Sequence, residues 1–187
     1  MKEICITMIA SLVMLSSYSQ GIYRSTASDI SFFAGTAIED INAVSEKAVS
    51  FLNIETGEVV VSIPIRSFHF DQSLMEEHFN ENYIESEKYP KAEFKGTIRN
   101  SSSLNWKSST TMTIVVDGTL SLHGVSRTRT FELHATGTDR KILVTSDFIV
   151  PLADHNIDRP KLLWEKLTDQ VEVKVKITYE QYQAPHH

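Results

Sequence analysis

Apolar residues recur at every second position along most of the chain from about Thr56 onward. A period of two is typical of β-strands that bury one face and expose the other. The pattern predicts six strands with these inward-facing sets: Val59, Val61, Ile63 and Ile65; Ala92, Phe94, Gly96 and Ile98; Met112, Ile114, Val116, Gly118, Leu120 and Leu122; Phe131, Leu133 and Ala135; Ile142, Val144, Ser146, Phe148 and Val150; Val171, Val173, Val175, Ile177 and Tyr179.

Short segments rich in glycine, serine and aspartate separate these runs, at 55–57, 100–103, 123–124 and 137–139. Such residues favour tight turns. Asp117-Gly118 has the same chemistry inside an apolar run, which indicates either a turn or a bulge in a long strand. Many short strands joined by tight turns predict an all-β, antiparallel protein, as a sheet, a barrel or a sandwich.

Two segments break the β pattern. Ser73-Leu74-Met75-Glu76 has the form of a capping box, and Leu74, Met75, His78, Phe79, Asn82 and Tyr83 share one helical face. A helix of two to three turns is predicted there, with its apolar face over the sheet. Pro160 suits the first position of a second helical turn.

The first residues have the layout of a secretory signal peptide, with Lys2, a largely apolar run over residues 4–15 and small residues at Ser17 and Ser19. We expect residues 1–19 to be removed, with cleavage near Ser19/Gln20, and one domain to span residues 22–182. The alternative is a membrane anchor, but the apolar run is shorter than the roughly 20 residues that a spanning helix needs. Loss of residues 1–19 would remove Cys5, the single cysteine.

Charge narrows the classes of partner. The net charge is −6 at pH 7, and Lys2 and Glu3 cancel, so removal of the leader leaves it unchanged. An acidic chain is poorly suited to bind nucleic acid or anionic lipid through bulk electrostatics. We therefore expect no nucleic-acid partner and no stable membrane insertion after processing.

Two blocks of sequence resemble the YceI-like family. One includes Lys88-Tyr89-Pro90-Lys91-Ala92-Glu93-Phe94-Lys95-Gly96, and the other is Gly118-Thr119-Leu120-Ser121-Leu122-His123-Gly124-Val125. The resemblance implies an extended, lipocalin-like antiparallel barrel of about eight strands. With the two helical segments above, the expected fold has one short helix after the third or fourth strand and a helical turn before the last strand. The resemblance also implies a location in the periplasm or outside the cell. The chain departs from the family pattern at residues 43–52, which lack the usual glycine-bearing strand.

The same resemblance implies a polyisoprenoid bound in the barrel interior, with no cofactor other than such a lipid or a quinone as ligand. The predicted lining consists of apolar residues from the inner strand faces and the helix: Ile63, Phe68, Met75, Phe79, Phe94, Ile114, Leu133 and Phe148. Each of these could equally be ordinary packed core. A barrel with a packed interior that acts through a protein-interaction surface is therefore the alternative, and the chain is expected to be a monomer or a homodimer.

No catalytic motif is recognisable in the chain. The histidines form no HExxH pair or comparable metal-ligand spacing. Asp154-His155-Asn156-Ile157-Asp158 places two carboxylates beside a histidine, yet a solvated loop has the same composition. His123 suits a turn as well as a catalytic base. We therefore predict a protein that is not an enzyme and binds no metal. After the lipid carrier and the interaction barrel, a metal-dependent hydrolase is the third hypothesis.

Overall fold

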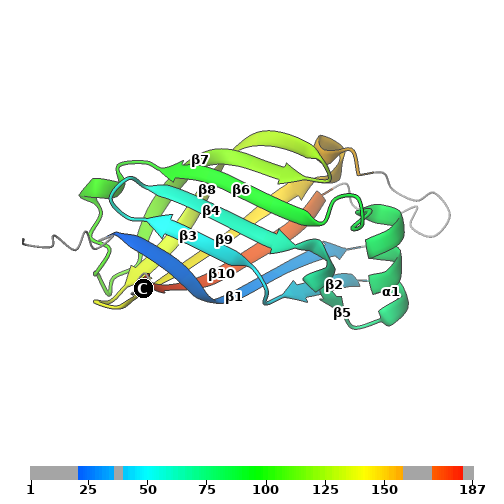
Figure 1. Ribbon diagram of the computed structural model, residues 1–187, viewed down its shortest axis with the longest axis horizontal. Coiled ribbons are helices and arrows are strands. Elements are labelled where there is room, and N and C mark those ends of the chain that lie inside the picture. The colour runs from blue at the N-terminus through cyan, green and yellow to red at the C-terminus, as the bar shows by residue number, and fades with distance from the viewer. Residues whose placement is uncertain (1–20, 36–39, 158–169, 183–187) are drawn as a thin grey trace, which may run out of the picture.

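The computed structural model describes residues 21–35, 40–157 and 170–182. They form ten β-strands, one short helix and several helical turns (Figure 1). The strands are β1 (Ile22–Gly35), β2 (Asp40–Ser45), β3 (Val49–Asn53), β4 (Glu58–Pro64), β5 (His69–Phe70), β6 (Lys91–Ile98), β7 (Met112–Leu122), β8 (Val125–Gly137), β9 (Lys141–Pro151) and β10 (Gln170–Gln181). The helical elements are η1 (Ile65–Ser67), α1 (Ser73–His78), η2 (Phe79–Tyr83), η3 (Ser101–Ser103) and η4 (Leu152–His155).

The strands form one antiparallel sheet in the order β10-β9-β8-β7-β6-β4-β3-β1-β2-β5, and β10 also pairs with β1, which closes a barrel. β1 pairs with β3 along its first part and with β2 along its second part. At the next position along the wall, β4 pairs with β3 and β5 pairs with β2. Because β2 with β3, and β4 with β5, each occupy one position in the wall, the barrel has eight positions. The prediction of an antiparallel barrel of about eight strands is confirmed.

Every run predicted from Thr56 onward is a strand, namely β4 and β6 to β10. His123 and Gly124 both have positive φ, 50° and 72°, and they join β7 to β8 in the predicted tight turn. Asp117-Gly118, by contrast, lies within β7 in unbroken register with β6 and β8, so it is neither a turn nor a bulge.

β1 is the longest strand, and the alternation pattern did not predict it. Its register with β10 shifts between Ser25 and Ala27, which marks a bulge. The buried residue before the bulge, Tyr23, is odd-numbered, whereas Ser28 and Ile30 after it are even-numbered. The bulge therefore shifts the period-two pattern by one residue in mid-strand. Because the alternation is interrupted, it does not reveal this strand in the sequence.

The predicted helix follows β5, which is the end of the third wall position, and it differs in detail from the prediction. α1 ends at His78 and continues as one π-helical stretch, η2. The residue at the N-cap is Gln72, with no side-chain capping bond, so the capping box does not form. Leu74, expected on the apolar face, is 59% exposed, while Met75 and Phe79 face the barrel.

One end of the barrel is packed with side chains. The connection between η3 and β7 places Trp106 there, and its indole Nε1 donates to the carbonyl of Ser101 at 3.1 Å. Gly137 lets this connection approach, because its N–H donates to the carbonyl of Ser108 and a Cβ would collide with the Trp106 backbone. The core at this end consists of Tyr23, Leu52, Val59, Ile98, Trp106, Ile114, Val116, Ala135, Ile142, Val144, Ile177 and Tyr179.

The ladder between β8 and β9 is short. It covers four pairs, from His134↔Thr145 to Gly137↔Ile142. Over the rest of these two strands, residues 125–133 and 146–151, all of which the structure describes, no ladder pair joins them. This part of the boundary between β8 and β9 therefore has no backbone pairing, and we call it the β8–β9 seam.

Two predictions fall outside the described residues. These are the signal peptide at residues 1–19 and the helical turn beginning at Pro160. Neither α1 nor any other helix in the described segments has the length and apolarity that crossing a bilayer requires.

Candidate functional site

A cavity of about 250 Å³ occupies the barrel between the packed Trp106 end and α1. Side chains from most strands, from the helix and from η4 contribute to its wall. The apolar lining residues are Ile30, Phe32, Ala34, Ile41, Val59, Val61, Ile63, Ile65, Phe68, Phe70, Met75, Phe79, Ile84, Ala92, Phe94, Leu120, Leu122, Phe131, Leu133, Val144, Phe148, Val150, Leu152, Ile157, Val171, Val173, Val175 and Ile177. Tyr83, Glu93, Ser146 and Tyr179 complete the lining.

The structure brings together seven of the eight residues predicted to line the site. They are Ile63, Phe68, Met75, Phe79, Phe94, Leu133 and Phe148. Ile114 faces the interior as its strand position predicts, but it lies in the packed core at the Trp106 end and is 3% exposed. Alternation along a strand shows which side chains point inward, not how deep along the barrel axis they lie. That the seven contact a ligand stays a prediction.

Four phenylalanines form a cluster where the helix meets the barrel. The Phe32 ring lies 5.2 Å from that of Phe68, 5.7 Å from Phe70 and 5.4 Å from Phe79, measured between centroids. These are ordinary packing distances for aromatic pairs. Phe79 comes from η2 and the others come from β1, β5 and the segment before β5, so the cluster ties the helical segment to three parts of the wall.

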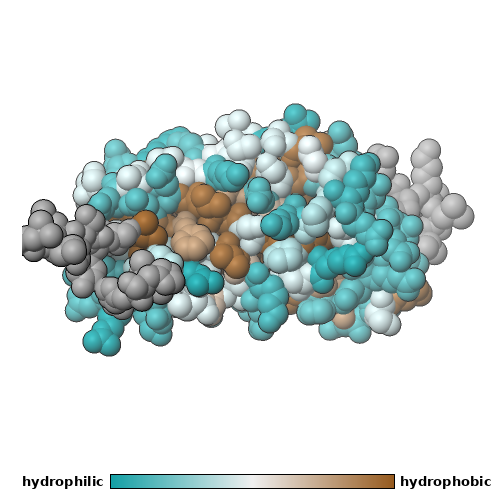
Figure 2. Space-filling model, in the orientation of Figure 1, coloured by the Kyte–Doolittle hydropathy of each residue, from teal (hydrophilic) through white to brown (hydrophobic). Residues whose placement is uncertain are grey.

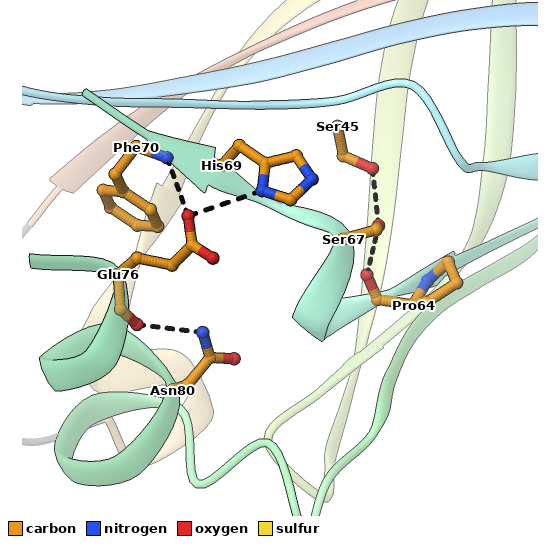
Figure 3. A network of polar contacts seen from close by, with 7 residues as sticks. All are labelled: Ser45, Pro64, Ser67, His69, Phe70, Glu76 and Asn80. Carbon is orange, nitrogen blue, oxygen red and sulfur yellow. Dashed lines mark hydrogen bonds and ion pairs between the residues drawn. The ribbon is translucent and has the colours of Figure 1, made fainter. Parts of the chain in front are cut away.

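Polar contacts fix α1 on this end (Figure 3). Glu76 Oε2 accepts a hydrogen bond from the Phe70 N–H at 3.2 Å and lies 3.4 Å from His69 Nδ1. Asn80 Nδ2 donates to the Glu76 carbonyl at 2.9 Å, which steadies the passage from α1 into η2. Glu76 thus binds β5 rather than its own helix N-terminus, and that is why the predicted capping box is absent.

A second aromatic group lies across the cavity, on β6, β8 and β9. The Phe131 ring is 5.3 Å from Phe94 and 4.3 Å from Phe148. Phe94 rests on Gly96 and Gly118, which are paired across β6 and β7. A Cβ on Gly118 would come within 2.5 Å of Phe94 Cζ, so the two glycines make the recess that holds this ring.

Polar atoms on the wall already have partners. The Ser146 hydroxyl donates to the Glu132 carbonyl at 2.7 Å. The Tyr179 hydroxyl lies 2.7 Å from Ser50 Oγ, and Ser50 itself donates to the Val60 carbonyl. Burial raises the pKa of Tyr179 to about 12, so the phenol stays neutral. The wall therefore offers apolar contact and little that could select a charged ligand.

A model of the YceI-like domain matches residues 23–179. The chain belongs to the YceI-like family. Among curated proteins, none matches the sequence at a significant level.

Solved structures of similar shape agree with this YceI-like assignment. A polyisoprenoid binding domain from Saccharophagus degradans has a TM-score of 0.76 at 17% identity, over 86% of this chain and 98% of that one. BcnA from Burkholderia cenocepacia has a TM-score of 0.68 at 15% identity, over 81% and 95%. A YceI protein from Campylobacter jejuni has a TM-score of 0.55 at 15% identity, over 73% and 81%. At these identities the likeness shows the fold.

Two histidines of this YceI-like chain, His123 and His155, hold loops together outside the cavity. His123 Nδ1 lies 3.1 Å from the carbonyl of His155, and its Nε2 lies 3.1 Å from Glu85 Oε2. His155 is fully buried, with Nδ1 3.1 Å from the Val125 carbonyl, and burial lowers its pKa. No group of three or more His, Cys, Asp or Glu side chains within the described segments is arranged to hold a metal ion.

Several lining residues escaped the sequence prediction. Phe131 and Val173 are on strand faces that the alternation predicts to point inward, so the sequence carried a signal for them. They were not among the eight residues predicted to line the site. Phe32 lies beyond the β1 bulge, where the period-two pattern has changed phase. Phe70 belongs to a two-residue strand that is too short to show a period.

Proposed function

We propose that this YceI-like protein is a non-enzymatic carrier or sequestering protein that binds an isoprenoid-like apolar lipid, a polyisoprenoid or a quinone, in the barrel interior. The observation that carries the proposal is the cavity itself, because its wall is apolar from the Trp106 end to α1. The similar Saccharophagus degradans protein is a polyisoprenoid binding domain, which supports the same ligand class.

Apolar burial supplies the driving force for such a ligand. Moving hydrocarbon out of water is favourable by about 0.8 kcal/mol per buried CH₂ group. A five-carbon isoprene unit therefore contributes roughly 4 kcal/mol before the cost of immobilising a flexible chain. Affinity then depends on the number of buried carbons and on the shape of the chain, since Ser146 and Tyr179 already have hydrogen-bond partners.

Adjacent residues on β9 provide a matched test. Phe148 faces the cavity, whereas its neighbour Ile149 points outward and is 49% exposed. We expect Phe148→Asn to lower the affinity for a C20 polyprenol at least tenfold, and Ile149→Asn to leave it within twofold. Titration monitored by displacement of a fluorescent isoprenoid measures both. Equal binding by the two variants would show that the cavity is not the lipid-binding site.

Export belongs to the same proposal. We infer that residues 1–19 are cleaved near Ser19/Gln20 and that the processed chain works in the periplasm or outside the cell. The apolar run and the small residues before the cut support this inference. N-terminal sequencing of the protein from its own host tests it: a chain that begins at Gln20 is expected, and an intact Met1 in the functional protein would contradict it.

One observation favours the alternative, a barrel that acts through a protein-interaction surface. Figure 2 shows apolar residues gathered over β3 and β4 on the outer face in view. The large apolar side chains exposed there are Val49 and Phe51 on β3 and Val60 on β4, each between 39% and 43% exposed. If such a surface is the functional one, Phe51→Ser should abolish self-association or partner binding and leave lipid titrations unchanged.

A further inference from the structure

The seam between β8 and β9 is a part of the cavity wall that no backbone ladder closes. Both strands contribute lining residues on either side of the seam, Phe131 and Leu133 from β8 and Phe148 and Val150 from β9. No ladder pair joins residues 125–133 to residues 146–151, although the structure describes all of them. Side chains alone therefore separate the cavity from the outside here.

Three sets of contacts close the seam. At the ladder end, the Ser146 hydroxyl donates to the Glu132 carbonyl at 2.7 Å. In the middle, the Phe131 and Phe148 rings stack with their centroids 4.3 Å apart.

At the far end, η4 bridges to β8. Arg127 Nε donates to the carbonyl of Asp154 at 2.7 Å, and Arg129 Nη2 lies 2.9 Å from Asp154 Oδ2. Between the Ser146 bridge and the η4 bridges, the Phe131 and Phe148 rings meet across the seam.

We propose that this seam is a lateral portal through which a hydrocarbon chain enters and leaves the cavity, with the stacked Phe131 and Phe148 rings as its gate. Rotation of two half-buried aromatic side chains opens it without breaking a backbone ladder, because no ladder exists there. On the two strand pairs that flank the seam, β7–β8 and β9–β10, the ladders are uninterrupted, so passage there would require several adjacent backbone hydrogen bonds to break together. The apolar rings also give the passing chain a continuous hydrocarbon surface.

The outer rim of the portal agrees with this role. Ile149, outward on β9 next to Phe148, is 49% exposed, so an apolar side chain borders the opening on the solvent side. Thr130 on β8 is exposed beside Phe131 on the opposite rim. A lipid chain leaving the gate thus meets an apolar contact before it meets water.

This inference rests on the proposed lipid-binding function, and its test separates the two. In a Cys5→Ser background, Thr130→Cys and Ile149→Cys are joined after folding with a short bis-maleimide, which straps the seam. The matched control joins Asp147→Cys to Lys174→Cys with the same reagent, since those exposed residues are ladder partners on β9 and β10. All-trans-retinol, a fluorescent isoprenoid alcohol, is the probe.

We expect the seam strap to slow both uptake and release of retinol at least tenfold in stopped-flow fluorescence, with the equilibrium affinity nearly unchanged. The control strap should leave both rates within twofold of the unlinked protein. Uptake at the unlinked rate through a strapped seam would overturn the portal while the carrier function stands. Absence of retinol binding by the unlinked protein would overturn both.

Discussion

Phe94 shows how single residues shape the interior. Its ring rests on Gly96 and Gly118 and contacts Phe131, so it forms part of the cavity wall where β6, β7 and β8 meet. The sequence predicted this residue correctly as inward-facing, because the Ala92–Ile98 run alternates without interruption. The sequence did not predict how far along the barrel axis Ile114 lies, since that position is defined by the core around Trp106.

Phe94→Asp is expected to abolish lipid uptake in a folded protein. A carboxylate in an apolar wall without a partner costs several kcal/mol when it is charged, and the lipid would remove its remaining water. Phe94→Leu keeps the wall apolar and should retain binding within about tenfold. Circular dichroism checks folding and polyprenol titration checks binding. Retained binding by a folded Phe94→Asp protein would remove this residue from the lining.

At the scale of elements, α1 depends on a contact that the sequence did not reveal. The Ser73-to-Glu76 spacing suggested a capping box, yet the Glu76 carboxylate accepts from the backbone of β5 instead. Local spacing cannot show that a backbone donor on another strand, the Phe70 N–H, competes for this carboxylate. The exposed Leu74 and the inward Met75 follow from the same docking, because β5 sets the rotation of the helix against the barrel.

Glu76→Ala should loosen this helix. Loss of the acceptor leaves the partly buried Phe70 N–H without its bond, at a cost of about 1 to 2 kcal/mol. Amide hydrogen exchange across residues 73–83 is expected to accelerate about tenfold. Glu77→Ala, an exposed neighbour on the same helix, is the control and should leave exchange unchanged. Similar exchange in both variants would contradict the anchoring role of Glu76.

On the outer surface, an ion pair and a hydrogen bond link the end of β6 to β7 and β8. They predict that the stability of the fold depends on pH. Arg99, after β6, holds Asp117 on β7 through two hydrogen bonds of 2.5 and 2.7 Å, and Thr130 on β8 donates to the same carboxylate. These bonds lower the pKa of Asp117 from 3.8 to about 2. Its folded pKa lies below the unfolded one, so the stabilisation is present above about pH 4 and is lost as pH falls toward 2.

Urea unfolding of the wild type and Asp117→Asn measures this effect. The wild type should be the more stable protein at pH 6, and the difference between the two midpoints should shrink steadily from pH 4 to pH 2. A difference that stays constant over that interval would assign the stabilisation to something other than the ionised carboxylate.

For the whole molecule, an eight-position barrel is the size at which the interior can be either filled or hollow. Periodicity and turn chemistry from Thr56 onward were enough to predict an all-β antiparallel protein, and the YceI-like resemblance added the closed barrel. Neither could predict that Trp106 fills one end while the interior between that end and α1 stays hollow. That division depends on contacts between residues far apart in sequence, as does the β8–β9 seam.

We propose above that the cavity between the Trp106 end and α1 holds an isoprenoid-like lipid. Native mass spectrometry of the protein purified gently from its own host, followed by organic extraction, tests it most directly. We expect one isoprenoid or quinone per chain, released by solvent and identified in the extract. A mass equal to the bare polypeptide, unchanged after incubation with polyprenols, would contradict it.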